Sequence, residues 1–572
     1  MTVTQVSPSA ASVDQSERQW SYTSGTSDTP LLGLTIGDLF DQTVEKYPDH
    51  AALISRQQQI KLTYRQLQKQ VNQCAKGLMQ AGFKKGDRVG ILSPNRVEWC
   101  VTQFATSKVG IILVNINPAY RLHELQYVLE QSGCSGLVIA PQFKSSNYTE
   151  MLYQLASELK ESEPGNLQSA KLPNLKMVIR LSSEKMPGMV SWDELMAMGD
   201  AVSDEQLSEQ QHDQEFDDPI NIQYTSGTTG FPKGATLSHH NILNNGYYVA
   251  HLQNFTHEDR LCIPVPLYHC FGMVMGNLGC VTHGATMVYP SEGFEPLAVL
   301  ETVQAEKCTA LYGVPTMFIA ELDHPDFAKF DLSSLRTGVM AGAPCPAAVM
   351  KKVIELMHMS EVEICYGMTE TSPVSTQTRI DAPLEKRVGT VGIIHPHLEI
   401  KIIDPETGKV VPIGKPGELC TRGYSVMLGY WNNPGATAEA IDEARWMHTG
   451  DLATMDAEGY VDIVGRIKDM IIRGGENVYP REVEEFLYTH PKVLDVQVIG
   501  VPDEKYGEEI MAWIKVKSGE RLTEEEVKVY CRGQIAHYKI PRYVKFVESF
   551  PMTVTGKIQK FLMRKQAVEE NL

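Results

Sequence analysis

Residues 220–234 read Ile-Asn-Ile-Gln-Tyr-Thr-Ser-Gly-Thr-Thr-Gly-Phe-Pro-Lys-Gly. The first five residues, 220–224, form a short apolar run typical of a β-strand. In the loop that follows, glycines let backbone N–H groups converge on an anion, hydroxyls add donors, and Lys233 adds positive charge. The loop therefore predicts a phosphate cradle. It lacks the Walker A spacing, and Pro232 precedes the lysine; taken alone, it is also compatible with a flexible Gly/Ser/Thr turn.

The rest of the N-terminal half repeats this alternation of strands and helices. Further short apolar runs lie at 89–92, 137–140 and 177–181, separated by helical stretches. The clearest helix covers residues 63–82, where Thr63 and Gln66 form a capping box. This order is expected of parallel sheets covered by helices. We therefore predict an α/β fold for the large part of the chain.

The pattern changes after residue 466. The sequence predicts a helix at 480–487, strands at 493–501, 511–516 and 543–547, and a capped helix from Thr523. Residues 467–572 carry 17 basic and 17 acidic side chains, so the whole net charge of −18 falls on residues 1–466. We therefore expect a large N-terminal domain at 35–466 and a small α+β C-terminal domain at 467–572.

The first 34 residues resemble no targeting signal. They are rich in Ser, Thr and Pro, and Arg18 is the basic side chain among the first thirty. A charged signal-peptide start and an Arg-rich transit peptide are both absent. We expect a flexible leader at residues 1–34.

Composition excludes some classes of function. A net charge of −18 over 572 residues opposes binding to a phosphate backbone, so nucleic acid is not expected as a partner. The eleven cysteines form no C-x-x-C pair, which favours reduced, buried thiols in the cytoplasm over disulfides or a zinc site. No transmembrane helix or lipidation signal is evident. The sequence leaves open a transient contact with a membrane surface and does not determine the oligomeric state.

Two stretches have unusual charge. Residues 200–218 contain eight acidic residues and no Lys or Arg, which predicts a solvated loop before the strand at 220–224. Residues 261–290 contain no charged side chain, but repeated Pro, Gly and His interrupt them. We expect a strand, a turn and a buried helix there, forming a pocket wall or core rather than a membrane span.

Three further motifs carry polar groups suited to a nucleotide. Tyr366-Gly367-Met368-Thr369-Glu370 offers a ring to stack on a base, a hydroxyl for a phosphate and a carboxylate for Mg²⁺. In Thr449-Gly450-Asp451, a turn carboxylate could accept hydrogen bonds from two ribose hydroxyls, and Arg466 supplies a guanidinium at the domain border. Near the C-terminus, Lys557 follows a glycine and could neutralise a carboxylate that meets a phosphate. Each motif alone could also be an ordinary surface loop.

Together these motifs resemble the adenylate-forming superfamily of acyl-CoA synthetases, aryl-CoA ligases, adenylation domains and luciferases, from about residue 35 to about residue 565. Residues 224–245, 266–272 and 553–561 look most similar to medium-chain acyl-CoA synthetases of the family-member-2 type. The resemblance implies a large AMP-binding N-terminal domain, a small mobile C-terminal domain and a reaction in two steps. A fatty acid and ATP first form an acyl-adenylate and pyrophosphate; coenzyme A then forms the thioester and releases AMP. The cosubstrates would be ATP and coenzyme A, with Mg²⁺ as cofactor.

The resemblance also assigns residues. Catalytic roles fall to Lys557, Thr369 and Glu370, with Glu370 as the Mg²⁺ ligand. Contacts with ATP or AMP fall to Thr225, Ser226, Gly227, Thr228, Thr229, Gly230, Lys233, Gly342, Ala343, Pro344, Tyr366, Gly367, Asp451 and Arg466. Lys468 occupies the hinge position, and a loop on the coenzyme A side contains Gly474, Gly475 and Glu476.

The acyl substrate is less directly indicated. The uncharged run suits an alkyl chain better than an ammonium group, which favours a fatty acid. Residues that we expect in the acyl pocket wall are His269, Phe271, Met275, Val314 and Pro315, although plain core packing would explain the same pattern. The alternatives are an aryl or other carboxylate-CoA ligase, a luciferase-like oxygenase and a non-catalytic nucleotide-binding protein.

Overall fold

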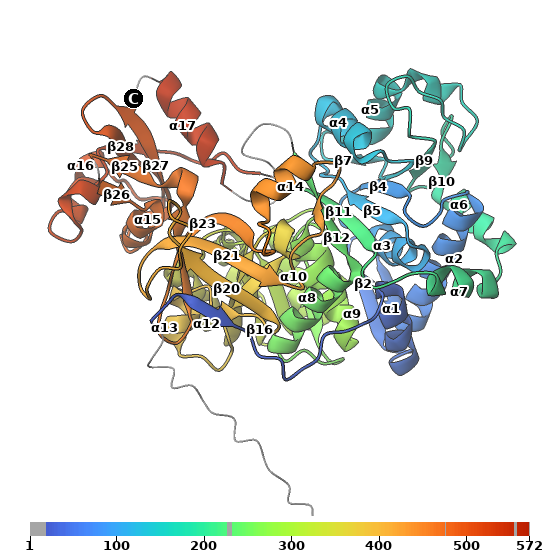
Figure 1. The fold of residues 1–572 in the computed structure, drawn as a ribbon, viewed down its shortest axis with the longest axis horizontal. Helices are drawn as coiled ribbons and strands as arrows, with labels where there is room; N and C mark the ends of the chain where they lie inside the picture. The colour runs from blue at the N-terminus through green and yellow to red at the C-terminus, as the bar shows by residue number, and fades with distance from the viewer. Residues whose placement is uncertain (1–18, 226–231, 475, 554–557, 571–572) are drawn as a thin grey trace, which may run out of the picture.

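A mostly parallel sheet of eight strands leads to the glycine-rich loop. A computed structural model of the chain describes residues 19–225, 232–474, 476–553 and 558–570 (Figure 1). The strand order is β10-β9-β6-β4-β5-β11-β12-β22, parallel from β10 to β11 and antiparallel beyond. The bounds are β4 (Arg88–Leu92), β5 (Ile112–Asn115), β6 (Gly136–Ile139), β9 (Met177–Arg180), β10 (Val190–Ser191), β11 (Pro219–Thr225), β12 (Lys233–Ser238) and β22 (Gly429–Tyr430). The strands predicted at 89–92, 137–140, 177–181 and 220–224 are confirmed.

A second, nine-stranded sheet has the order β19-β18-β17-β16-β15-β13-β14-β2-β3. Its strands from β17 to β2 are parallel, as expected of a sheet covered by helices. The bounds are β2 (Ala51–Ser55), β3 (Ile60–Thr63), β13 (Arg260–Cys262), β14 (Thr286–Tyr289), β15 (Ala310–Gly313), β16 (Thr337–Ala341), β17 (Glu361–Gly367), β18 (Val374–Gln377) and β19 (Ile393–Ile394).

Helices pack between and around these two sheets. The largest hydrophobic cluster joins residues of both sheets to residues of α1, α2, α3, α8 and α9, so the main core lies between the sheets. The helices of this part are α1 (Ile36–Lys46), α2 (Tyr64–Gln80), α3 (Val97–Val109), α4 (Leu122–Ser132), α5 (Tyr148–Leu155), α6 (Trp192–Met198), α7 (Asp204–His212), α8 (His239–Leu252), α9 (Gly279–His283), α10 (Pro296–Glu306), α11 (Pro315–Leu322), α12 (Ala347–Leu356), α13 (Leu384–Gly389) and α14 (Pro434–Ala440). A small hairpin joins β7 (Gln142–Phe143) and β8 (Ser146–Asn147).

A third sheet is antiparallel, in the order β1-β20-β21-β23-β24. Its strands are β1 (Tyr22–Ser24), β20 (Leu398–Ile403), β21 (Gly417–Gly423), β23 (Met447–Met455) and β24 (Val461–Arg466). Within residues 19–34 the structure differs from the flexible leader expected at residues 1–34, and residues 1–18 lie outside the described residues. β1 pairs with β20, and the Leu32 backbone N–H donates to Asn244 Oδ1 at 2.7 Å. Residues 20–34 are therefore held by long-range hydrogen bonds that the local sequence does not reveal.

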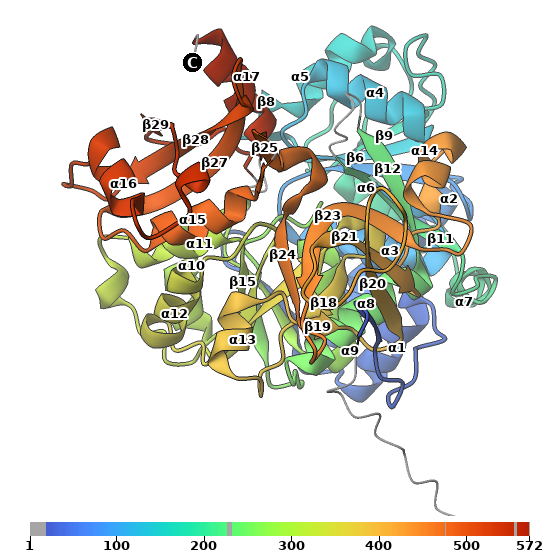
Figure 2. The same ribbon diagram turned by 60° about the vertical axis from the view of Figure 1, so that its left-hand side comes forward.

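The C-terminal part forms its own α+β unit, as predicted. It contains β25 (Ile471–Arg473), β26 (Glu476–Val478), β27 (Val493–Asp503), β28 (Gly507–Val516), β29 (Tyr543–Phe546), α15 (Pro480–Tyr488), α16 (Glu524–Cys531) and α17 (Lys560–Glu569). The strands make one sheet with two hydrophobic clusters of their own. In Figures 1 and 2 these orange-to-red elements lie to one side of the molecule, beside the sheet that contains β21 and β23.

Two local predictions have different outcomes. The capping box of Thr63 and Gln66 at the start of α2 is confirmed by reciprocal hydrogen bonds. The solvated loop predicted at 200–218 is wrong, because α7 occupies much of it. Ser203 and Gln206 form a capping box, and the acidic residues in the first turn stabilise the helix by their interaction with the helix dipole.

The uncharged run folds into buried elements. β13 leads into a π-helical segment, η4 (Phe271–Leu278), then α9 and β14, and every residue of η4 is buried. This confirms the strand, turn and buried helix. All eleven cysteines are free and buried. Among the described residues, none of the helices combines the length and the apolar character needed to cross a membrane.

Candidate active site

The carboxyl ends of β16 and β17 form one wall of the candidate site. These parallel neighbours pair Ala341 with Cys365, so Gly342, which follows β16, and Tyr366, near the end of β17, lie at the same edge of the sheet. Ligands of open α/β sheets commonly bind at this end of the strands. Gly342 has a φ of +85°, and a Cβ there would lie 3.3 Å from Val314 Cγ1. The predicted adenine residues Gly342, Ala343 and Pro344 therefore lie in the loop after β16, beside the end of β17.

Asp451 approaches this edge from the third sheet. Its Oδ2 accepts a 2.8 Å hydrogen bond from the Tyr366 hydroxyl, and its Oδ1 lies 3.2 Å from Arg466 Nε. Asp451 and Arg466 face each other across β23 and β24. Burial, followed by the Asp451 carboxylate, raises the pKa of Tyr366 well above its usual value, so the phenol remains a donor at neutral pH. The structure thus brings together three residues predicted to hold adenine and ribose.

The Asp451 motif differs from the turn predicted for it. Thr449, Gly450 and Asp451 lie within β23, where Gly450 has a φ of +70° and the pairing is irregular. Glu418, which sequence reasoning missed, supports this irregular segment because its Oε1 accepts from the Gly450 N–H at 3.1 Å. The side chain lies on β21, some thirty residues earlier, so local sequence gave no signal for it.

Glu370 is the centre of a second group. It lies in the short helix η6 (Thr369–Thr371) and is 5% exposed. Its Oε1 accepts from Thr225 Oγ1 at 3.2 Å and from the Tyr430 hydroxyl at 2.9 Å. Burial, followed by Glu370, raises the pKa of Tyr430. Tyr430 was missed from the sequence; the Gly429-Tyr430-Trp431 run, a glycine followed by two aromatics, was the signal available.

The two ends of the glycine-rich loop meet beside Glu370. Thr225 ends β11, and its register partner Lys233 begins β12. Lys233 Nζ lies 5.1 Å from the centre of the Tyr430 ring. The predicted residues Ser226, Gly227, Thr228, Thr229 and Gly230 lie outside the described residues. The described ends of the loop therefore bring the Thr225 hydroxyl and the Lys233 ammonium group close to the Glu370 carboxylate.

These oxygen donors fit a hard cation. Mg²⁺ prefers one or two carboxylates together with substrate phosphates and water. Glu370 supplies a carboxylate, and the bonds from Thr225 and Tyr430 both fall on its Oε1. The predicted phosphate loop begins at Thr225, next to that carboxylate. The donor set is therefore compatible with a magnesium–phosphate complex.

Three of the five expected acyl residues lie in the main core. Phe271, Met275 and Val314 belong to the same hydrophobic cluster, and the Phe271 ring lies 5.6 Å from that of Tyr312. Pro315 begins α11. His269 Nδ1 accepts from the Phe271 N–H at 3.2 Å. The next residue, Cys270, places its sulfur 3.9 Å from Thr369 Oγ1, which connects this apolar region to the Glu370 helix.

Position 367 requires glycine because the backbone of Pro373 lies too close to leave room for a side chain. A Cβ at this position would lie 1.8 Å from the Pro373 carbonyl oxygen. The residue follows Tyr366 at the end of β17 and precedes η6. Glycine at 367 therefore allows the chain to pass directly from the Tyr366 ring to the Thr369 and Glu370 side chains.

The border of the C-terminal part lies next to Arg466. Lys468 is exposed in the short helix η7 (Ile467–Asp469), between β24 of the third sheet and β25 of the C-terminal sheet. Arg564 of α17 donates to the Lys468 carbonyl at 3.3 Å and pairs with Asp469 at 3.1 Å. A cavity of about 410 Å³ lies close by, lined in part by Asp462 and Arg481. The chain thus changes sheets at Lys468.

The remaining predicted residues lie in the C-terminal part. Gly474 has a φ of +60°, and its N–H donates to the Tyr506 carbonyl at 2.8 Å. Glu476 begins β26 and is exposed. Gly475 and Lys557 lie outside the described residues.

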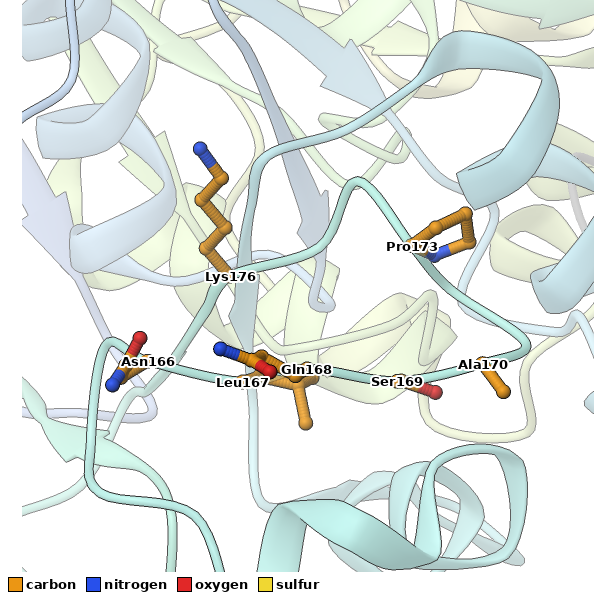
Figure 3. A pocket seen from close by; sticks show the side chains of 7 residues that line it. All are labelled: Asn166, Leu167, Gln168, Ser169, Ala170, Pro173 and Lys176. Atoms are coloured by element: carbon orange, nitrogen blue, oxygen red, sulfur yellow. The ribbon is translucent and has the colours of Figure 1, made fainter.

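A separate surface hollow is unrelated to these groups. Its volume is about 390 Å³, and Figure 3 shows the seven side chains that line it, all from residues 166–176. Lys176 is the one charged side chain among the seven. None of the seven is a predicted site residue, so this hollow contributes nothing to the candidate site.

Comparison with known proteins agrees with this geometry. Residues 40–431 match the family described as AMP-binding enzyme, and residues 482–557 match the AMP-binding enzyme C-terminal domain. YngI of Bacillus subtilis, described as an acyl-CoA synthetase, is 51% identical over 539 residues, covering 94% of this chain and 98% of YngI. The mitochondrial medium-chain acyl-CoA ligase ACSF2 of Danio rerio is 48% identical, covering 96% and 91%.

Solved structures show the same fold. ATP-bound MatB from Rhodopseudomonas palustris superposes with a TM-score of 0.80 at 29% identity, covering 94% of this chain and all of MatB. The anthranilate-CoA ligase AuaEII, in complex with anthranoyl-AMP, superposes with a TM-score of 0.83 at 28% identity, covering 96% and 99%. These matches confirm the resemblance inferred from the motifs: the chain belongs to the family of AMP-binding enzymes.

Proposed function

We propose that this chain is an ATP-dependent acyl-CoA synthetase that activates a fatty acid of medium chain length. The observation that carries the proposal is the convergence of two groups from three sheets, Tyr366 with Asp451 and Thr225 with Glu370. The full-length similarity to YngI and ACSF2 supports the same activity. The enzyme is an AMP-forming acid–thiol ligase with ATP and coenzyme A as cosubstrates.

In the first step, the chain's residues hold ATP for attack by a carboxylate on the α-phosphate. Asp451 accepts from the ribose hydroxyls, while Tyr366 and the loop at 342–344 border the adenine. Thr225, Lys233 and the loop between them hold the β- and γ-phosphates, and Thr369 donates to the α-phosphate. When bound at Glu370, Mg²⁺ would neutralise phosphate charge as pyrophosphate leaves.

Lys557 completes this step. A carboxylate and a phosphate repel each other, so an ammonium group between them lowers the barrier by stabilising the charge of the transition state. No side-chain nucleophile is required, because the fatty-acid carboxylate is itself the attacking group. The acyl-adenylate then reacts with the thiol of coenzyme A, and AMP is the leaving group.

We propose that the domain at 467–572 rotates about Lys468 between the two steps, relative to the domain at 35–466. The change of sheets at η7 supports this position, because hinges are short segments between packed elements that absorb dihedral change. Rotation removes Lys557 from the site and brings the loop of Gly474, Gly475 and Glu476 to the pantetheine path.

The apolar surroundings of the site favour an alkyl substrate. Every residue of η4 is buried, and residues 261–290 bring no charged side chain to this region. An alkyl chain can pack against such a wall, whereas a substrate ammonium group would be buried there without a charged partner. The second candidate, an aryl-CoA ligase, is favoured by the structural similarity to AuaEII.

The proposal is tested by pyrophosphate release from purified protein with ATP and Mg²⁺. The acids are straight-chain alkanoates of increasing length and benzoate, each with and without coenzyme A. An optimum at a medium-chain alkanoate, with AMP and thioester formed only when coenzyme A is present, is expected. An optimum at benzoate would make the protein an aryl-CoA ligase, and no release with any acid would leave a non-catalytic nucleotide-binding protein.

The cellular location belongs to the same proposal. The eleven free, buried cysteines support a reducing compartment, and we propose the cytoplasm. Fractionation of cells that express a tagged full-length chain tests this location. Recovery with an organelle or membrane fraction would contradict it.

A further inference from the structure

One group of three metal-ligating side chains stands apart from the nucleotide residues. Across residues 19–225, 232–474, 476–553 and 558–570, it is the one group of at least three His, Cys, Asp or Glu side chains whose ligand atoms lie close together. Its members are Glu418, Cys420 and His448, with one ligand atom of each within 4.8 Å of the others. Glu418 and Cys420 are two residues apart in β21, so their side chains face the same side of the sheet.

His448 completes the group from the adjacent strand. It is the register partner of Cys420 across β21 and β23. His448 Nδ1 lies 3.6 Å from Cys420 Sγ and 3.0 Å from Glu418 Oε2. One ring nitrogen therefore faces both the sulfur and the carboxylate oxygen.

The two separations at His448 Nδ1 are close to the edges of a tetrahedral metal site. Zinc bonds of about 2.0–2.1 Å to nitrogen and 2.3 Å to sulfur place the two ligand atoms about 3.6 Å apart at the tetrahedral angle. The corresponding nitrogen–oxygen edge is about 3.3 Å, close to the 3.0 Å between His448 and Glu418. His448 thus needs only small movements to share one ion with Cys420 and Glu418, whose ligand atoms lie within 4.8 Å of each other.

The surroundings also suit a metal ligand set. His448 Nε2 lies 3.8 Å from Asp442 Oδ2, and metal-bound histidines usually direct their other nitrogen to a carboxylate. Cys420 is fully buried and packs with Ile403 and Trp446, which form an apolar wall behind the sulfur. The His448 side chain is 30% exposed, so the group can be reached from solvent, and water could supply a fourth ligand.

We propose that Glu418, Cys420 and His448 bind a divalent cation of the zinc type, separate from the Mg²⁺ complex at Glu370. A thiolate and an imidazole select such borderline cations over Mg²⁺. On binding, the Cys420 thiol loses its proton to solvent, and His448 binds through Nδ1 in the tautomer that carries its proton on Nε2, which faces Asp442. The ion links β21 to β23, and β23 also carries Asp451.

Cobalt binding tests the proposal, because Co²⁺ reports on its ligands by absorption. The full-length protein, without ATP, is titrated with Co²⁺ in excess Mg²⁺, so that hard carboxylate sites are already filled. We expect one equivalent of Co²⁺ per chain, with tetrahedral d–d bands and a thiolate-to-cobalt charge-transfer band, and displacement of both by Zn²⁺. Absence of the charge-transfer band, or its loss in Mg²⁺, would overturn the proposal.

Variants identify the ligands. C420S should lose the charge-transfer band. E418Q, H448Q and D442N, the last of which alters the carboxylate beside His448 Nε2, should each weaken Co²⁺ binding by roughly tenfold or more. C134S removes another fully buried cysteine, outside this group, and should bind as the parent protein does. Circular dichroism establishes that each variant is folded; if C420S is not, H448Q and D442N still decide. Retention of the band in folded C420S, or unchanged affinity in H448Q and D442N, would overturn the assignment.

Discussion

The Tyr366 hydroxyl donates to Asp451 Oδ2 at 2.8 Å, and this bond joins two different sheets. Tyr366 is the penultimate residue of β17 in the nine-stranded sheet, whereas Asp451 lies in the antiparallel sheet, 85 residues further along the chain. Because Asp451 also contacts Arg466, its carboxylate is oriented from two sides. The bond therefore fixes the predicted ribose ligand relative to the predicted adenine ring contact.

Replacing Tyr366 with Phe should weaken ATP binding. The variant keeps the ring but removes a hydrogen bond to a charged acceptor, which contributes about 1.5 kcal/mol, or roughly a tenfold increase in the KM for ATP. The KM for the fatty acid should remain unchanged. Pyrophosphate release at varied ATP and saturating acid gives the KM for ATP, and release at varied acid and saturating ATP gives the KM for the acid.

A double-mutant cycle tests whether the two residues act together. D451N alone should weaken ATP use more than Y366F, and Y366F should add little in the D451N background. Fully additive effects on the KM for ATP would show that the hydrogen bond does not orient Asp451.

Tyr430 should assist the Mg²⁺ ligand without replacing it. E370Q removes the charge and should lower kcat/KM for ATP by roughly two orders of magnitude or more. Y430F removes only the bond to Glu370 Oε1 and should lower it roughly fivefold while raising the half-saturating Mg²⁺ concentration. Y153F, which removes a tyrosine hydroxyl bonded to the Pro187 carbonyl, is the matched control. A Y430F enzyme with unaltered Mg²⁺ dependence would contradict this role.

Substitution of Lys557 by Ala should separate the two half-reactions. Adenylation should fall by roughly two to four orders of magnitude, because the charge between carboxylate and phosphate is lost. Thioester formation from supplied acyl-adenylate should remain largely intact. K565A removes a lysine whose side chain is 69% exposed and should affect neither step. Equal loss of both half-reactions in K557A would contradict a rotation that moves this lysine away.

The buried His239 should make the fold sensitive to acid. Burial lowers its pKa to about 4, and its Nδ1 accepts from the Ile36 N–H at 3.1 Å, which requires an unprotonated nitrogen. The unfolded chain binds this proton near pH 6.5, so the free energy of unfolding falls as pH decreases below that value. The histidine accounts for a loss of about 2 kcal/mol between pH 7.5 and pH 5.

H239N tests this assignment, because an amide oxygen can accept the Ile36 N–H without titrating. The variant should show a smaller decrease in unfolding midpoint between pH 7.5 and pH 5 than the parent protein. The same decrease in both proteins would assign the acid sensitivity to other groups.

Local sequence predicted those elements whose signal is local. The capping box at Thr63 and the buried run at 261–290 were recognised because hydrogen bonds and apolar periodicity lie within a few residues. The acidic segment was misread because its composition resembled a loop, while Ser203 and Gln206 cap a helix there. The N-terminal strand β1 was missed because its partner, β20, lies far along the chain.

By itself, the sequence determined the alternation of strands and helices, the separate C-terminal unit and the order of the nucleotide motifs, because each depends on residue types at short spacing. Only the tertiary structure decided that Tyr366 donates to Asp451, that Tyr430 contacts Glu370, and that His448 faces Cys420. Each of these pairs joins residues 28 to 85 positions apart. Their meeting depends on sheet order and register, which long-range packing sets and short-range patterns do not encode.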